Sequence, residues 1–184
     1  MCSMRLANMG VGRSLPVNCN RPSKAEYYLG IAEAVAKRGT CLRRLYGAVI
    51  VNNDQIISTG YVGAPRHMKN CIDIGRCLRQ EKDIPPGERY ELCRSVHAEM
   101  NAIIHASRLE MVGGDLYLVG FSVEDGSYVS NSEPCKLCKR MIINSGIARV
   151  YVRRGPAKED IVEFLVDDWI QNEESLFDTG KGSY

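Results

Sequence analysis

One histidine and two cysteines stand at spacings typical of a catalytic zinc site. Cys135 and Cys138 lie three positions apart at the start of an expected helix, so both sulfurs project from the same side of its first turn. The positive end of that helix lowers thiol pKa values and favours the thiolates that bind zinc. His97 begins a second expected helix. A catalytic zinc ion has three protein ligands and one open position for water, and these residues supply the three.

Glu99 is the candidate acid–base residue of this site. Two thiolates cancel the charge of Zn²⁺ and make the ion a weaker Lewis acid, so the bound water benefits from a nearby base. In the first turn of a helix, His97 and Glu99 can both point past the end of the axis. Glu99 can therefore take a proton from the water and hand it to a leaving amine.

Each motif is weak when it is read alone. H-x-E occurs by chance, and His97 is then a buried, hydrogen-bonded histidine, whereas C-x-x-C at Cys135 and Cys138 is then half of a zinc knuckle. In this order the two motifs match the zinc-deaminase signature H-x-E…P-C-x-x-C. A zinc-stabilised scaffold without turnover is the alternative from another class. Glu99 argues against it, because a structural site has no use for an acid–base group.

The composition fits one globular domain that acts on a small molecule. The chain has 184 residues, of which 45% are apolar and 25% charged, as ordinary globular domains have. Its 24 Lys and Arg against 22 Asp and Glu give a net charge of +2. This balance disfavours a nucleic acid polymer as partner, and with it a polynucleotide-editing deaminase. A membrane partner is not expected, because no apolar run approaches the roughly 20 residues of a bilayer span.

Eight cysteines are the unusual feature of the composition. A chain of this length forms a core without disulfides, and residues 1–22 lack the apolar region of a signal peptide. These observations indicate zinc rather than disulfides and a cytoplasmic location. A transit peptide stays open as an alternative, because residues 1–22 contain no acidic residue.

Alternating helices and strands are expected to position the site. Ser23 and Glu26 form a capping box ahead of a helix that runs to about Arg38, and Asn53-Asp54 is a hairpin turn. Strands are predicted at 47–52, 55–60, 115–121 and 148–153, helices at 97–108 and 135–146, and a long irregular loop at 61–94. Residues 160–171 fit either a helix or a strand.

This order predicts one three-layer α/β/α sandwich. Strand–helix–strand units imply right-handed crossovers and parallel pairing. The expected organisation is a flexible N-terminal tail at 1–22, a zinc-dependent deaminase domain at 23–172 and a frayed C-terminal tail at 173–184.

Over residues 24–153 the sequence resembles the deoxycytidylate (dCMP) deaminase family of the cytidine deaminase superfamily. The segments that carry the resemblance are Thr40–Arg44, Gly47–Ile50, Ser58–Tyr61, His97–Ile103, Pro134–Cys138 and Met141–Asn144. The resemblance implies a five-stranded mixed sheet, hydrolytic deamination of dCMP to dUMP in support of thymidylate synthesis, and a homo-oligomer that is commonly a hexamer. It places zinc on His97, Cys135 and Cys138, and a proton shuttle on Glu99.

The family's G-Y-N-G loop lies near the nucleotide sugar and phosphate and, in regulated members, bears on a triphosphate effector site. Here it reads Gly60-Tyr61-Val62-Gly63. Val62 lacks the amide that could hydrogen-bond a sugar hydroxyl. This departure weakens the expectation that dCTP and dTTP act as effectors, and it leaves dCTP as an alternative substrate. The substrate-binding candidates are Arg44, Tyr61, Val62, Arg66 and Ala98, with the two arginines considered for the phosphate.

Four further cysteines suggest a second, structural zinc ion. Some family members carry such an ion with cysteines at the positions of Cys41 and Cys71, and Cys77 and Cys93 could complete a four-thiolate site. His67 is the alternative fourth ligand. Free buried thiols are the simpler interpretation. The remaining Cys2 and Cys19, in the N-terminal tail, are expected to be unliganded.

His105 and Arg108 follow His97 on its expected helix and are candidates for an effector site or a subunit interface. The simpler interpretations are a packed histidine and an arginine that favours the helix dipole. Trp169 lies outside the motifs and is expected to pack in the core.

Overall fold

A computed structural model describes residues 21–85 and 87–177. Within these residues, the strands are β1 Arg44–Asn52, β2 Gln55–Tyr61, β3 Asp115–Ser122, β4 Arg149–Arg153 and β5 Ile161–Leu165. The α-helices are α1 Lys24–Ala36, α2 Cys71–Ile74, α3 Leu78–Glu81, α4 Ala98–Ile104, α5 Arg108–Met111, α6 Lys136–Ser145, α7 Val166–Gln171 and α8 Glu174–Phe177, and two 3₁₀ turns are η1 Tyr90–Leu92 and η2 Lys158–Asp160. None of the described helices is long and apolar enough to cross a bilayer.

The strands form a mixed sheet in the order β2–β1–β3–β4–β5. Asn53 and Asp54 adopt positive φ angles of 48° and 63°, as a two-residue hairpin turn requires, and this turn makes β1 and β2 antiparallel. Parallel pairing occurs only between β3 and β4 among the described strands. The expected pairing of β2 with β3 was wrong, because β1 lies between these two strands, which the α4 crossover joins.

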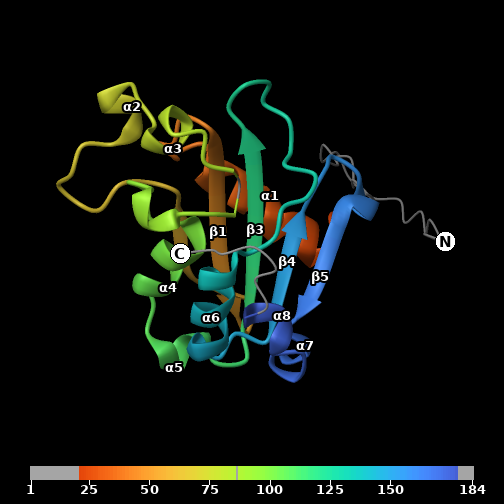
Figure 1. The fold of residues 1–184 in the computed structure, drawn as a ribbon. Coiled ribbons are helices and arrows are strands. Elements are labelled where there is room, and N and C mark those ends of the chain that lie inside the picture. Colours follow the sequence, from red (N-terminus) through yellow and green to blue (C-terminus); the bar gives the residue numbers. More distant parts are fainter. Residues whose placement is uncertain (1–20, 86, 178–184) are drawn as a thin grey trace, which may run out of the picture.

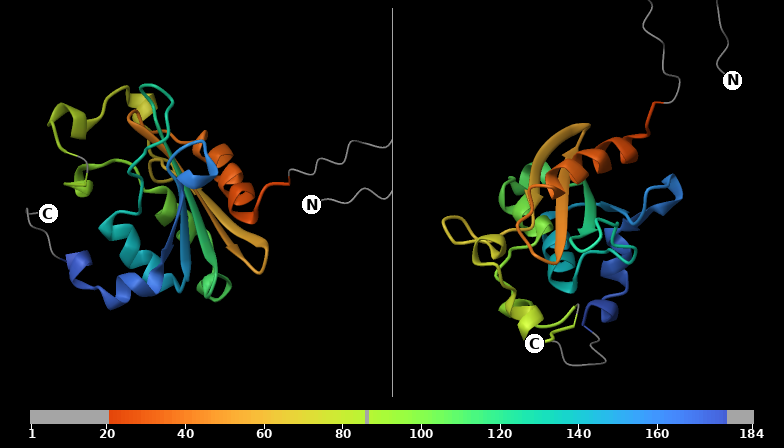
Figure 2. Two further views of the ribbon diagram at one scale, coloured as in Figure 1. Left: turned by 90° about the vertical axis from the view of Figure 1, so that its right-hand side faces the viewer. Right: turned by 90° about the horizontal axis from the view of Figure 1, so that it is seen from above.

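Helices cover both faces of the sheet, which confirms the three-layer sandwich. Helix α1 lies on one face, and α4, α6 and α7 lie on the other (Figures 1 and 2). Alternate residues of β1 point to opposite layers: Val49 and Val51 pack with α1, whereas Ala48 and Ile50 pack with α4 and α6.

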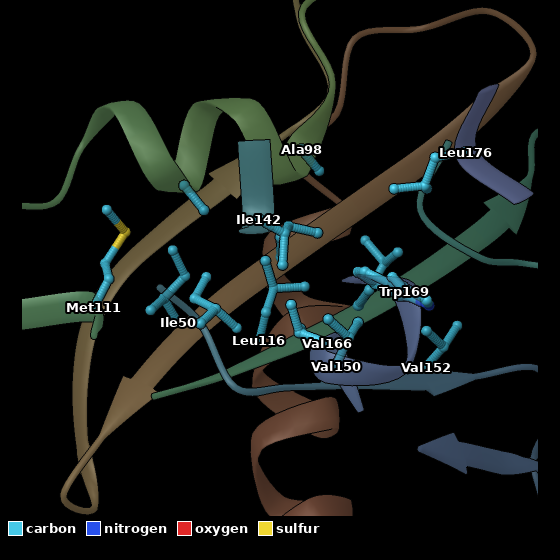
Figure 3. Packing of buried hydrophobic residues seen from close by; sticks show 14 residues of the cluster. Ile50, Ala98, Met111, Leu116, Ile142, Val150, Val152, Val166, Trp169 and Leu176 are labelled. Carbon is cyan, nitrogen blue, oxygen red and sulfur yellow. The ribbon is translucent and has the colours of Figure 1, made fainter. Parts of the chain in front are cut away.

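The larger core cluster lies under the helices that carry the candidate zinc ligands. Its side chains come from β1, β3 and β4, from α4, α5, α6, α7 and α8, and from Ile147 between α6 and β4, and they point toward one another (Figure 3). Ala98 of α4 and Ile142 of α6 are both fully buried in it. Trp169 is also buried there, beside Phe164, so its predicted packing role is confirmed.

The capping box predicted for the first helix is present. The Ser23 hydroxyl accepts a hydrogen bond from the Glu26 backbone N–H (3.2 Å), and the Ser23 N–H donates to Glu26 Oε2 (2.9 Å). The helix ends at Ala36, two residues before the predicted end.

The helix predicted from His97 to Arg108 is interrupted. Helix α4 ends at Ile104, and α5 starts at Arg108 after a new capping box between Ser107 and Glu110. Serine at this position offers the backbone an alternative to a continuous helix, a signal that apolar periodicity alone does not register.

The C-terminal part of the chain also differs from expectation. Residues 160–171 contain both of the predicted alternatives in succession, because β5 is followed directly by α7. The expected frayed tail begins with α8, whose Leu176 is buried in the larger cluster. Cys2, Cys19 and most of the expected N-terminal tail lie outside the described residues, as do residues 178–184.

The packing of α1 on β1 generates a prediction about stability. At Gly47, a Cβ would lie 2.2 Å from the Ala32 carbonyl oxygen and 2.4 Å from the Ala36 nitrogen, both in the backbone of α1. We expect Gly47→Ala to push α1 away from the sheet and to destabilise the fold by about 1–3 kcal/mol. Urea unfolding followed by circular dichroism measures this change.

Gly30→Ala is the matched control, because this glycine is exposed within α1 and a Cβ added there would meet nothing within 4 Å. Replacing a helix-interior glycine should stabilise the protein by about 0.5–1 kcal/mol. If both variants changed stability in the same direction, the close approach at Gly47 would not be the cause.

Candidate metal centre and active site

Helix α4 is held directly against β2 by a glycine and by two side chains. At Gly60, a Cβ would lie 2.3 Å from both the Ala98 carbonyl oxygen and the Ala102 nitrogen. The Ser58 hydroxyl donates a hydrogen bond to the Ala102 carbonyl (2.7 Å) and Asn101 Nδ2 donates to the Tyr61 carbonyl (2.8 Å). The position of α4 on the sheet is therefore fixed by contacts that each involve the main chain of β2 or of α4.

A short β-bridge fixes the residue before His97. The Gly63 N–H donates to the Val96 carbonyl (3.2 Å), and the Val96 N–H donates to the Gly63 carbonyl (2.8 Å). His97 follows as the N-cap of α4. The bridge thus fixes the backbone immediately before His97.

Helix α6 brings the two cysteines to the same edge. Cys135 is the N-cap of α6 and Cys138 lies in its first turn. His97 Nδ1 lies 3.5 Å from the Cys135 sulfur and 3.4 Å from the Cys138 sulfur. The three potential ligand atoms all lie within 4.8 Å of one another.

This arrangement fits a tetrahedral zinc ion. Zinc–nitrogen bonds of about 2.0 Å and zinc–sulfur bonds of about 2.3 Å place nitrogen and sulfur ligands about 3.5 Å apart, in agreement with the distances between His97 and the two sulfurs. Contacts with Cys138 and His97 lower the pKa of Cys135 to about 4. The neighbouring Cys135 and burial raise the pKa of Cys138. A cation between the two sulfurs would allow both to be thiolates.

Glu99 lies in the first turn of α4, next to these ligands. Its residue is only 5% exposed, and burial raises the pKa of its carboxyl group, although the charge of His97 acts in the opposite direction. A carboxyl group whose charged form is destabilised by burial is suited to bind and release a proton.

These residues open onto a cavity of about 730 Å³. His97, Glu99 and Cys135 lie in its wall, together with three of the expected substrate-binding residues, Arg44, Val62 and Ala98. Tyr61 and Arg66 are not among the residues that line it. Val62 is buried, and its N–H donates to the Tyr46 carbonyl (3.0 Å). This valine, which stands where the family loop has an asparagine, is one of the residues that line the cavity.

Arg66 and His105 lie together on the exposed side of α4. Arg66 Nη2 is 3.3 Å from His105 Nε2, and His105 Nδ1 is 3.2 Å from the Thr59 carbonyl oxygen. Arg66 therefore contacts His105 rather than lining the cavity, and its binding of the substrate phosphate stays a prediction. Arg108 donates from Nε to the Asn144 carbonyl (3.0 Å) and thereby joins α5 to α6.

The four cysteines of the expected second site line the same cavity. These are Cys41, Cys71, Cys77 and Cys93. Cys71 is buried beside Ser95, with 3.8 Å between their side-chain sulfur and oxygen. Of the described residues, only His97, Cys135 and Cys138 form a group of three or more at ligand distance. The four thiols therefore share a cavity without closing a site, and the alternative ligand His67 is exposed outside the cavity lining.

Among the cavity-wall residues not singled out from the sequence are Tyr46, Arg79 and Tyr90. Tyr46 shares the face of β1 that carries Ala48, so its period-2 spacing was the available signal. Arg79 and Tyr90 come from the long loop. In this loop the spacing of apolar residues follows no regular period, so the sequence does not distinguish a residue that lines the cavity from one that faces solvent.

Comparisons with known proteins agree with this geometry. Residues 22–154 match the sequence profile of the cytidine and deoxycytidylate deaminase zinc-binding region. The chain is 36% identical over 136 residues to a deoxycytidylate deaminase of Mycobacterium phage D29, which covers 71% of this chain and 94% of that protein. It is 35% identical over 130 residues to a deoxycytidylate deaminase of Schizosaccharomyces pombe, covering 71% of this chain but only 37% of the yeast protein.

A solved structure shows the same fold. The dCMP deaminase of cyanophage S-TIM5, in complex with dCMP and dUMP, superposes with a TM-score of 0.54 at 24% identity, over 83% of this chain and 93% of that one. The match of the zinc-binding profile to most of the chain, over a site that can hold zinc, shows that the chain belongs to the cytidine and deoxycytidylate deaminase family.

Proposed function

We propose that the protein is a zinc-dependent hydrolase that deaminates dCMP to dUMP. The observation that carries this proposal is the placement of Glu99 beside the His97, Cys135 and Cys138 group, in the wall of one cavity. The similarity to deoxycytidylate deaminases at 35–36% identity supports the substrate class.

The chemistry follows from the residues around the cavity. Zinc, when bound by His97, Cys135 and Cys138, lowers the pKa of a water molecule and so supplies a nucleophile at neutral pH. In hydrolytic deamination the water oxygen bonds to C4 of the cytosine ring, the C4–amine bond breaks and ammonia leaves. Glu99 accepts the two protons of the water in turn and delivers one to N3 of the ring and the other to the leaving amine. Its burial keeps this transfer away from bulk water.

The cavity also supports dCTP as an alternative substrate. Val62 presents an apolar side chain where the family loop has an asparagine. The loss of this amide changes the contacts available to the sugar, and Arg44 in the same wall provides a cation for phosphate.

Assembly and location extend this proposal. We expect a homo-hexamer in the cytoplasm, with dCTP and dTTP as candidate effectors and with His105 and Arg108 near a subunit contact. The proposed domain organisation is a tail at 1–22 followed by a deaminase domain at 23–172. Light scattering after size exclusion measures the subunit number, and a monomer would contradict the assembly.

A second, structural zinc ion on Cys41, Cys71, Cys77 and Cys93 belongs to the same proposal. All four of these cysteines line the same cavity. Burial raises the pKa of Cys71, and the neighbouring Cys41 and Cys77 act in the same direction. Their sulfurs would have to move closer together to reach ligand distance.

The role of Glu99 predicts a loss of turnover without a loss of zinc. We expect Glu99→Gln to lower kcat for dCMP by about 10²–10⁴-fold, because the amide cannot carry the proton. Ammonia release measures turnover, and atomic absorption measures the zinc content. The same assay on deoxycytidine, CMP and dCTP, with and without dCTP or dTTP as effectors, establishes the substrate range.

Glu159→Gln provides the control, because Glu159 is an exposed acid in η2, and its kcat should equal that of the parent. A parent protein that releases no ammonia from any cytosine nucleotide would refute the enzyme. Turnover by zinc-loaded Glu99→Gln at the parent rate would refute the assigned proton transfer.

The two metal sites predict a zinc stoichiometry. We expect two zinc ions per chain in the parent and one in Cys71→Ser, which retains the catalytic ion and part of the activity. His97→Asn should also retain one ion but lose turnover. A parent that binds a single zinc ion would eliminate the structural site and leave the catalytic one untouched.

A further inference from the structure

The wall of the cavity carries an excess of positive charge. Five arginines line it against three acids, and two of these acids are paired, Glu91 with Arg89 and Glu133 with Lys139. Four arginines in the wall form no ion pair with any described residue: Arg43, Arg44, Arg79 and Arg94. The cavity is therefore suited to an anionic ligand.

Arg79 is distinguished from the other three by its burial. It is only 7% exposed, whereas each of the others is less buried. Its Nη2 donates to the Pro85 carbonyl (2.6 Å), and its Nε is buried without a hydrogen-bond partner in the described chain. An arginine cannot discharge by losing its proton, so a buried guanidinium with one carbonyl partner has unused capacity to bind an anion.

Tyr90 connects this guanidinium to the metal centre. The Arg79 guanidinium carbon lies 4.7 Å from the centre of the Tyr90 ring. The Tyr90 ring in turn meets the His97 ring edge to face, with 4.8 Å between ring centres. The buried cation is thus one aromatic ring away from a zinc ligand. In a cytosine nucleotide the sugar lies between the base and the 5′-phosphate, so a phosphate site must lie apart from the metal ligands rather than beside them.

We propose that Arg79 binds the 5′-phosphate of the nucleotide and so selects nucleotides over nucleosides. This inference rests on the proposed function, because that function places the cytosine ring at His97. The guanidinium offers charge-assisted hydrogen bonds to the phosphate oxygens. The competing role is structural: Arg79 would hold the loop only through Pro85 and Tyr90.

The test compares a substrate that has a phosphate with one that does not. We expect Arg79→Gln to lower kcat/KM for dCMP by at least about tenfold, the loss typical of a hydrogen bond to a charged group. The value for deoxycytidine should stay within twofold of the parent. Calorimetry should show the same pattern without turnover, with weaker binding of dUMP and unchanged binding of deoxyuridine.

Two further variants make the comparison specific. Arg89→Gln removes an exposed, ion-paired arginine from the same loop and should leave the preference for dCMP over deoxycytidine unchanged. Arg79→Lys keeps the charge but loses the planar fork, so its preference should fall between those of the parent and Arg79→Gln. If Arg79→Gln does not fold, Arg79→Lys decides the test through the same ratio.

The outcomes separate the two proposals. Equal losses for dCMP and deoxycytidine, or equal losses in binding of dUMP and deoxyuridine, would overturn phosphate binding by Arg79 and leave the structural role. An unchanged preference in a folded variant would overturn it as well. The proposed function fails earlier and separately, if the parent protein releases no ammonia from dCMP or the other cytosine nucleotides.

Discussion

Helix α4 rests on the main chain of β2 with no side chain between them at Gly60. This contact sets the height of α4 above the sheet, and Ser58 and Asn101 prevent the helix from sliding along it. The first turn of α4 carries both a zinc ligand and the proton carrier. Because interiors are close-packed, an error in that height would pass directly to His97 and Glu99. The geometry of the metal centre therefore depends on a backbone approach that only glycine permits.

The same dependence explains which parts of the site could be predicted from the sequence. His97, Glu99, Cys135 and Cys138 were identified because each stands at a helix start and because ligand chemistry restricts the residue types. The mixed sheet was inferred from the family resemblance, whereas strand order alone had suggested parallel neighbours. The apolar pattern could not reveal the break after Ile104, because a local serine cap decides it.

The loop between β2 and α4 was the least predictable part. Its three helical segments are too short for the spacing of their apolar residues to reveal a helical period. Arg66 was chosen for the phosphate because it follows the glycine-rich loop, yet it pairs with His105 outside the cavity. Arg79 looked like any solvated arginine, and only the three-dimensional packing on Tyr90 shows that it is buried. The role of a charged loop residue therefore depends on the residues that surround it in the folded structure.

The β-bridge between Gly63 and Val96 marks the boundary between this loop and the segment that carries His97. It closes residues 64–95 into a loop whose two ends are fastened to each other at its base. The entropy cost of closing such a loop rises only slowly with its length. Insertions and deletions within it can thus reshape one wall of the cavity while His97 stays in register with Cys135. Part of the cavity wall can therefore change during evolution without a change in the segments that carry His97, Glu99, Cys135 and Cys138.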